Sequence, residues 1–197
     1  RGVYALRINS DVLRWVDRDN HTVQEKLPRA EGDRYVGLVI LFDTEDGTPL
    51  AIMPDGYIQK LRVGATSAIG VDYLARDDAA TVGLLGAGWQ AEGQVAALDE
   101  VFDVEHLSVY TPSESRVRFA DSVESEYGID TDPVDTPEAV FDADIVHAAT
   151  NARSPVFDVD WIDQGTHLGV INRTEIPPET LDTCDLTVVH SKTGKAK

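Results

Sequence analysis

A short glycine-rich stretch near the middle of the chain constrains its fold more than any other feature. Residues 81–91 read TVGLLGAGWQA. The apolar residues before the first glycine are typical of a parallel strand that is buried on both faces. Residues 90–98 carry apolar side chains at helical spacing. Gly86 and Gly88 lie between the two, so a strand, a sharp turn and a helix follow one another, as they do in a dinucleotide-binding turn.

The glycine pattern is Gly-x-Gly-x-x-Ala, and alanine is tolerated at its third position. The pyrophosphate of a dinucleotide would bind the free backbone amides at the start of the helix, where the helix dipole favours an anion. The expected cofactor-binding residues of this turn are Gly86, Ala87, Gly88, Trp89, Gln90 and Ala91. The alternative is an ordinary structural turn, and the strand and helix on either side favour the dinucleotide turn over it.

Strands and helices alternate after this turn. Strands are expected over 107–110, 132–134, 144–149, 166–171 and 186–189, helices over 113–126 and 137–141, and a helical turn over 177–181. This alternation predicts an α/β protein with a doubly wound parallel sheet of the Rossmann type over residues 76–191. Residues 192–197 would form a short tail.

The first 75 residues have a different pattern. We expect a strand over 1–10, a polar and turn-rich segment over 11–34, a hairpin of 36–42 with 49–53, and a helix over 57–74. Gly64 and Gly70 lie within that helix and would let it pack closely against a neighbour. Residues 1–75 are therefore predicted to be part of a second, α+β domain.

The charge of the chain limits its partners. Asp and Glu total 35 against 17 Lys and Arg, which gives a formal net charge of −18. The acidic residues are spread along the chain as a solvated surface, and concentrated salt would screen their repulsion. We therefore expect a halophilic protein, and we expect it to bind neither nucleic acid nor an anionic membrane.

Composition also bears on compartment and metal binding. No apolar run approaches the ~18 residues that a membrane-spanning helix needs, and no export leader is visible, so a cytoplasmic protein is expected. Cys184 is the single cysteine, which excludes an intrachain disulfide. The histidines lack metal-ligand spacing, so no metal site is expected. His147 and His167 would be core histidines.

Several motifs in a fixed order resemble the ornithine cyclodeaminase/mu-crystallin family. They are DGYI at 55–58, LRVGATSA at 61–68, YLAR at 73–76, LGAGWQA at 85–91, ADIV at 143–146, ATN at 149–151 and WIDQGTH at 161–167. The resemblance covers nearly the whole chain and is weakest over residues 1–35. It implies a homodimer of two-domain subunits that uses NAD(H) or NADP(H) to oxidise amino acids or reduce imines.

The resemblance also assigns candidate substrate-binding residues. Arg62 matches the family arginine that holds the substrate carboxylate, a role that suits a guanidinium because it can bind two oxygens at once. Arg7 falls where the family has a lysine that contacts or protonates the substrate. Arginine cannot donate a proton near neutral pH, so Arg7 could only hold an anion. The alternative for both residues is an ordinary surface arginine.

The family's catalytic aspartate has no clear counterpart. Asn172 or Thr174 takes its place, depending on where a one-residue gap falls, and neither is an acid or base in this pH range. Glu175 could serve only if the loop takes a different route, and a glutamate in a polar loop is more often solvated. Imine reduction could survive these changes, since hydride transfer depends mainly on the cofactor and on positioning.

The residues that follow the second strand of the parallel sheet indicate which cofactor is preferred. NAD enzymes have an acidic residue there to hold the ribose, whereas this chain has Thr111. Ser113, Ser115 and Arg116 could hold a 2′-phosphate, with Glu114 as an unfavourable neighbour. NADP(H) is therefore predicted over NAD(H).

Thr150 and Asn151 follow a later strand and would line the nicotinamide side of the crevice. The alternative for this pair is a turn or a helix cap, which threonine and asparagine often make.

Taken as a whole, the sequence predicts an NAD(P)H-dependent imino acid reductase, or an amino acid dehydrogenase when the reaction runs in reverse. Its partner would be a small amino or imino acid that bears a carboxylate. The alternative is an NAD(P)H-binding protein of the mu-crystallin type without turnover, which the missing lysine and aspartate favour.

Overall fold

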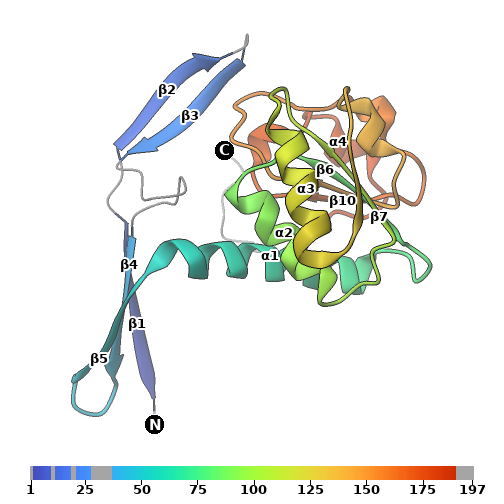
Figure 1. Cartoon of the computed structure of the whole chain (residues 1–197). Coiled ribbons are helices and arrows are strands. Elements are labelled where there is room, and N and C mark those ends of the chain that lie inside the picture. Colours follow the sequence, from blue (N-terminus) through green and yellow to red (C-terminus); the bar gives the residue numbers. More distant parts are fainter. Residues whose placement is uncertain (1, 10–11, 19–20, 28–36, 190–197) are drawn as a thin grey trace.

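The computed structural model describes residues 2–9, 12–18, 21–27 and 37–189 (Figure 1). Its main sheet consists of β6 (Thr81–Leu85), β7 (His106–Tyr110), β8 (Asp130–Pro133), β9 (Ile145–Ala148) and β10 (His167–Val170). The strand order is β10-β9-β6-β7-β8, and every pair is parallel. The chain leaves β6 toward β7 on one side and later returns to β9 on the other, which is the order of a doubly wound sheet. The predicted Rossmann fold is confirmed.

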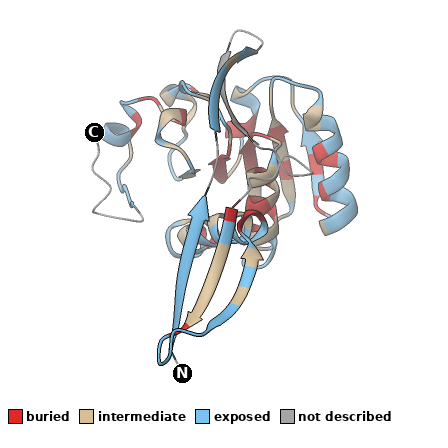
Figure 2. Cartoon of the chain, turned by 90° about the vertical axis from the view of Figure 1, so that its left-hand side faces the viewer, coloured by how far each residue is buried: buried red, intermediate tan, exposed pale blue. Residues whose placement is uncertain are grey.

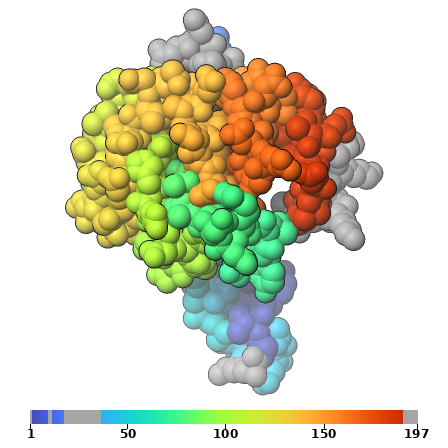
Figure 3. Space-filling view, turned by 90° about the vertical axis from the view of Figure 1, so that its right-hand side faces the viewer, coloured from blue at the N-terminus to red at the C-terminus, as the bar shows by residue number. Residues whose placement is uncertain are grey.

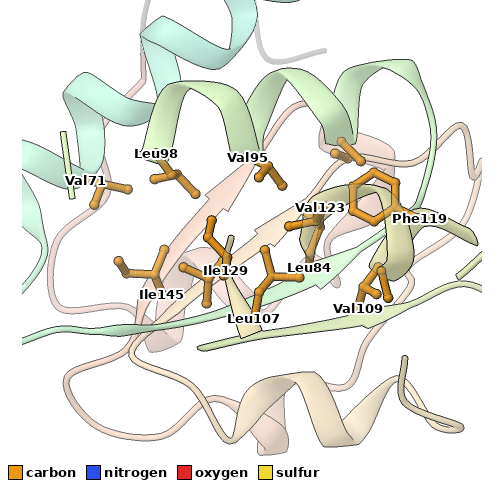
Figure 4. Packing of buried hydrophobic residues seen from close by; sticks show 14 of the residues in the cluster. Val71, Leu84, Val95, Leu98, Leu107, Val109, Phe119, Val123, Ile129 and Ile145 are labelled. Carbon is orange, nitrogen blue, oxygen red and sulfur yellow. The ribbon is translucent and has the colours of Figure 1, made fainter. Parts of the chain in front are cut away.

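Two apolar layers enclose this sheet. On one face pack α2 (Trp89–Asp99), α3 (Ser115–Tyr127) and the end of the long helix α1 (Asp55–Leu74). Figure 4 shows this core, in which residues such as Val95, Leu107 and Ile145 are almost completely buried. The other face is covered by the 3-10 helix η2 (Glu138–Phe141) and by the segment that includes Phe157.

A small antiparallel sheet precedes α1. It consists of β1 (Val3–Asn9), β4 (Gly37–Asp43) and β5 (Pro49–Pro54), in the order β1-β4-β5. This sheet projects from the body of the molecule (Figure 3), and β1 is exposed along its whole length (Figure 2).

The expectation of a polar, turn-rich segment over 11–34 was wrong for its first part, where β2 (Val12–Arg18) pairs with β3 (His21–Leu27). β2 reads VLRWVDR, so its β-branched and aromatic residues are mixed with charged ones. Cross-strand pairing outweighs the polar composition of the segment. The Arg153 guanidinium carbon lies 4.1 Å from the centre of the Trp15 ring, so the hairpin reaches the loop that follows β9.

The segment after β10 also differs from its prediction. It contains η4 (Arg173–Glu175) and a short helix α4 (Thr180–Thr183), while a further 3-10 helix, η3 (Val159–Trp161), precedes β10. The expected strand over 186–189 is wrong, because these residues are exposed and pair with no described strand. An apolar run forms a strand only where a partner offers backbone hydrogen bonds. The predicted tail over 192–197 lies outside the described residues.

Helix α1 packs against α2 through a contact that only glycine permits. A Cβ atom added to Gly64 would lie within 2 Å of the Gly93 carbonyl oxygen, and one added to Gly93 would lie 2.6 Å from the Lys60 side chain. The predicted close packing at Gly64 is therefore confirmed. At Gly70 it is wrong, since a Cβ there would meet nothing within 4 Å.

These two glycines give a matched pair of variants with opposite expected effects. Gly64→Ala should lower the free energy of unfolding by about 1–3 kcal/mol, because the added methyl group forces α1 and α2 apart. Gly70→Ala should raise it by about 0.5–1 kcal/mol, because alanine is the better helix former and has room. Urea unfolding followed by circular dichroism measures both, and equal effects would contradict the helix contact.

His147 is a buried core residue on β9. With its proton on Nδ1, the ring donates to Gln94 Oε1 at 3.0 Å, while Nε2 has no partner among the described residues. The ring lies against Gly169, where a Cβ atom would come within 2.5 Å of Nε2. Burial, with a smaller contribution from the His167 charge, lowers the pKa of His147 to about 3.

This lowered pKa makes stability depend on pH. Below pH ~6.5 the unfolded ring takes up a proton that the buried ring refuses, so the free energy of unfolding should fall by about 1.4 kcal/mol per pH unit. That loss continues down to pH about 3. Denaturant unfolding at several pH values should show a shallower dependence for His147→Leu than for the wild type. Parallel curves for the wild type and His147→Leu would contradict the burial.

Candidate cofactor and substrate site

The glycine turn lies where the carboxyl ends of three parallel strands meet. Gly86 has a φ of 109°, a conformation that side chains disfavour. Its amide donates to the Tyr110 carbonyl at 2.8 Å, which ties the turn to β7. A Cβ atom at Gly86 would lie 2.5 Å from the Ala149 carbonyl oxygen just after β9. Only glycine therefore fits at this position.

The space in front of α2 is open. Gly88 is the residue that precedes α2, no side chain caps the helix, and a Cβ atom at Gly88 would meet nothing within 4 Å. Ala91 faces the sheet and is fully buried, while Ala87 is half-buried against the same core. Gly88 thus supplies no capping side chain, and the amides at the start of α2 fit the pyrophosphate of a dinucleotide.

Trp89 connects this turn to the start of α1. Its indole Nε1 donates to the Gly56 carbonyl at 3.3 Å, and its ring centre lies 6.3 Å from that of Tyr57. The Lys60 ammonium lies 4.0 Å from the Trp89 ring centre and 3.1 Å from Glu92 Oε2. The N-terminus of α1 is therefore held beside the dinucleotide turn.

Arg7 reaches this place from β1. Its Nη2 atom lies 2.6 Å from Oδ2 of Asp55, the first residue of α1. The Asn9 amide, in the orientation that satisfies both of its polar atoms, donates to Asp55 at 3.3 Å and accepts from Arg7 at 3.1 Å. The hydrogen bond to Asp55 raises the pKa of Arg7, so this residue is a permanent cation.

Arg62 lies on the same side of α1 as Asp55. The two are seven residues apart, which is two helical turns or about 10 Å along the axis. The Arg62 side chain is exposed, and no carboxylate in the described part of the chain forms an ion pair with it. One face of α1 thus carries Arg62 and, two turns earlier, Asp55, which binds the second cationic group, Arg7 of β1.

The ribose side of the site follows β7. Thr111 is half-buried directly after the strand, and the Ser113 and Ser115 hydroxyls lie 2.6 Å apart. The Arg116 guanidinium lies 3.0 Å from Asp135 and 3.4 Å from Glu114. This arginine is therefore shared between two carboxylates.

The loop after β9 is fixed by a buried glutamate. Both the amide and the hydroxyl of Thr150 donate to Glu175 Oε1 at 2.5 Å, and the Asn172 amide donates to Oε2 at 2.8 Å. Glu175 is fully buried; burial raises its pKa, against the smaller lowering effect of these hydrogen bonds. The expectation of a solvated Glu175 was wrong, because the carboxylate is buried and accepts hydrogen bonds from Thr150 and Asn172.

Two of the sequence-predicted residues lie next to this carboxylate. The Asn172 side chain accepts from the Thr174 amide at 3.2 Å and forms a capping box with Glu175. Asn151 follows Thr150 and is exposed. The strand ends that carry Gly86, Thr111 and Thr150 are thus brought together, while Asn172 lies on the next loop along the edge.

Sequence reasoning missed the roles of Asp55 and Glu175. A signal existed for Glu175, because asparagine followed three residues later by glutamate is a capping-box pattern. For Asp55, the signal was its position on the same helical face as Arg62. The ion pair with Arg7 spans 48 residues of sequence and has no local pattern.

None of the described helices is long and apolar enough to cross a membrane. Within the same described residues, no group of three or more His, Cys, Asp or Glu side chains could hold a metal ion.

Sequence comparison finds relatives of this chain among known proteins. The chain is 33% identical to a Δ1-pyrroline-2-carboxylate reductase of Bacillus cereus over 163 residues, which are 79% of this chain and 50% of that protein. It is 32% identical to an alanine dehydrogenase of Archaeoglobus fulgidus over 170 residues, 86% of this chain and 51% of that protein. The chain thus spans about half the length of these relatives.

Solved structures show the same fold. A Δ1-pyrroline-2-carboxylate reductase of Thermococcus litoralis in complex with NADH and L-proline superposes with a TM-score of 0.72 at 27% identity, covering 89% of this chain and 63% of that one. An archaeal alanine dehydrogenase dimer with bound NAD gives a TM-score of 0.64 at 27% identity, covering 83% and 56%.

The family model for ornithine cyclodeaminases and mu-crystallins matches residues 13–191. Relatives in this family are nicotinamide-dependent oxidoreductases that act on small amino or imino acids. The glycine turn, the order of the motifs and the match over most of the chain lead to one conclusion: the chain belongs to the ornithine cyclodeaminase/mu-crystallin family.

Proposed function

We propose that this protein reduces a small imino acid with NAD(P)H, or oxidises the corresponding amino acid in the reverse direction. One observation carries the proposal. The Gly86–Gly88 turn, where Gly88 offers no side chain to cap α2, lies beside the N-terminus of α1. Arg62 belongs to α1, and Arg7 of β1 contacts Asp55 at the start of that helix. An anion-binding turn for a dinucleotide and cations for a carboxylate are thus both associated with the packed helices α1 and α2.

The substrate carboxylate would bind the guanidinium groups of Arg62 and Arg7. A guanidinium can donate to both carboxylate oxygens at once, and its charge does not depend on pH near neutrality. Neither arginine can supply the proton that a reduced imine nitrogen takes up at neutral pH, so that proton would come from solvent water. The protein's own contribution to the reaction is therefore binding and orientation of the substrate.

The nicotinamide would supply the hydride when the cofactor is bound. Gly86, Ala87 and Gly88 would hold the pyrophosphate, and Thr150 with Asn151 would line the nicotinamide side. Glu175 fixes the Thr150 backbone and hydroxyl, so this wall of the site is rigid.

We further propose a homodimer in the cytoplasm. The outer face of the small sheet exposes Tyr4, Leu6 and Ile8, an apolar surface that a second subunit would cover. The lone Cys184 fits a reducing compartment.

The alternative function is NAD(P)H binding without turnover. The observation that favours it is the Asn172 side chain, which is occupied as a loop cap and carries no titratable proton. The exposed arginine pair opposes it, since a binding protein for the cofactor alone has no need of a carboxylate site.

An assay of NAD(P)H absorbance tests the function directly. Full-length protein in molar potassium chloride should oxidise NADPH or NADH in the presence of Δ1-pyrroline-2-carboxylate or a related cyclic imine. Arg62→Ala should lower kcat/KM at least about tenfold, because a charged hydrogen bond to the substrate is lost, and should leave the cofactor Kd unchanged. Cofactor binding without consumption of any imino acid would support the binding protein instead.

NADP(H) remains our proposal for the preferred cofactor. Thr111 presents no carboxylate to repel a 2′-phosphate. The partners of Arg116 are Asp135 and Glu114, which are 91% and 80% exposed, and surface ion pairs of this kind are worth only about 0–1 kcal/mol. A doubly charged phosphate, aided by the Ser113 and Ser115 hydroxyls, could replace them.

Fluorescence titration with both cofactors checks this preference. NADPH should bind more tightly than NADH, and Arg116→Ala should weaken NADPH binding about tenfold while changing NADH binding less than about twofold. Arg118→Ala, an exposed arginine on the same helix, serves as the control. Tighter binding of NADH by the wild type would refute the assignment.

A further inference from the structure

We infer that Asp55 is a positioning residue that fixes the Arg7 guanidinium for the substrate carboxylate, an inference that rests on the function proposed above. The Arg7–Asp55 pair is asymmetric in its burial. The Arg7 side chain is 42% exposed, whereas that of Asp55 is 4% exposed. The buried Asp55 carboxylate therefore binds one side of the guanidinium. The other side is exposed, and its N–H groups can bind a second anion.

Asp55 is itself fixed in place. It is the first residue of α1, where the helix dipole favours a negative charge. The Asn9 amide donates to the same carboxylate oxygen that Arg7 contacts. Gly37 faces both residues, and a Cβ atom there would lie 2.6 Å from the end of the Asn9 side chain, 3.1 Å from Asp55 Cβ and 3.2 Å from Asp55 Oδ2. A larger residue at position 37 would therefore crowd the Asp55 carboxylate.

The pair also lies close to the cofactor-binding turn. Gly56, the next residue after Asp55, accepts the indole hydrogen bond of Trp89 in the first turn of α2. Asp55 is thus one residue away from a hydrogen bond that joins α1 to the dinucleotide turn. Its contact with Arg7 therefore links that guanidinium to the cofactor-binding turn, besides neutralising a charge.

Arginine is better suited than lysine to this arrangement. A guanidinium is planar and donates along several directions, so it can serve Asp55 with one edge and a substrate carboxylate with another. An ammonium group is a point charge without this fixed fork. The residue at position 7 therefore acts as a bridge between a buried carboxylate and a bound one.

The chain offers a matched control at the other end of α1. Arg76, two residues after that helix, pairs with Asp144, which also accepts from the Ala80 and Thr81 amides. Asp144→Asn therefore perturbs a comparable arginine–carboxylate pair that has no place in the site.

The test is a double-mutant cycle on the full-length protein with Δ1-pyrroline-2-carboxylate as substrate. Asp55→Asn should raise KM about tenfold and change kcat less than about threefold. In an Arg7→Ala background, the same substitution should change KM less than about twofold, because the guanidinium that it positions is gone. Asp144→Asn should lower the melting temperature and leave KM unchanged.

A second variant covers a failure of Asp55→Asn to fold. Gly37→Ala keeps the Asp55 charge and crowds its position, so it too should raise KM for the imino acid. Calorimetric binding of L-proline to the NADH-loaded protein gives a readout without turnover, and Asp55→Asn should weaken it about tenfold.

Two results would overturn the role of Asp55: an equal rise in KM in both arginine backgrounds, or loss of stability with unchanged KM and unchanged L-proline affinity. Failure of the proposed function would look different, because the wild type would then consume no NAD(P)H with any imino acid. Weakened L-proline binding in Asp55→Asn would still support the positioning role in that case.

Discussion

The close approach of α1 and α2 at Gly64 and Gly93 is the constraint on which the rest of the structure depends. Without side chains at these positions, the two helices meet backbone to backbone. Lys60 and Trp89 add a cation–π contact at the same crossing. This packing holds the glycine turn before α2 and the residues at the start of α1 in a fixed arrangement. The turn follows a strand of the parallel sheet, whereas α1 follows a strand of the small sheet.

Each end of α1 is then tied to the structure by an arginine and an aspartate. At the N-terminus, Asp55 is buried and pairs with Arg7 of the small sheet. At the C-terminal end, Arg76 pairs with Asp144, which also accepts from the amides of Ala80 and of Thr81, the first residue of β6. Salt screens exposed pairs more than partly buried ones. Because the Asp55 side chain is 4% exposed and that of Asp144 is 22% exposed, salt should weaken these two links less than pairs between fully exposed side chains.

The features predicted correctly from the sequence are those that depend on residues close together in the chain. The glycine turn was recognisable because a strand, a positive-φ glycine and a helix each need particular residues at particular positions. The same is true of the alternation that identified the parallel sheet. The strand expected over 186–189 was wrong because pairing depends on a partner, and the β2–β3 hairpin was missed because its composition is polar.

The contacts that build the candidate site were beyond local reasoning. Arg7 and Asp55 are 48 residues apart, and Thr150 and Glu175 are 25 residues apart. Each pair meets only because a helix or loop crosses a strand end in the folded chain. The sequence could nominate Arg7 as an anion binder, but it could not show that a buried carboxylate already holds one side of it.

The length of α1 between its contact with α2 and its N-terminus determines how far a small tilt of the helix would move Asp55. Gly64 lies nine residues from Asp55, so the part of the helix beyond the contact is a stiff arm about 14 Å long. A tilt of only ~5° at the contact would carry the end of that arm by about 1 Å, a displacement that can cost an enzyme about a hundredfold in rate. Gly64 is thus the point about which the N-terminal part of α1 would tilt. Because Gly64 has no side-chain atoms, α1 packs directly on α2, and this contact fixes the position of Asp55, and through it that of Arg7.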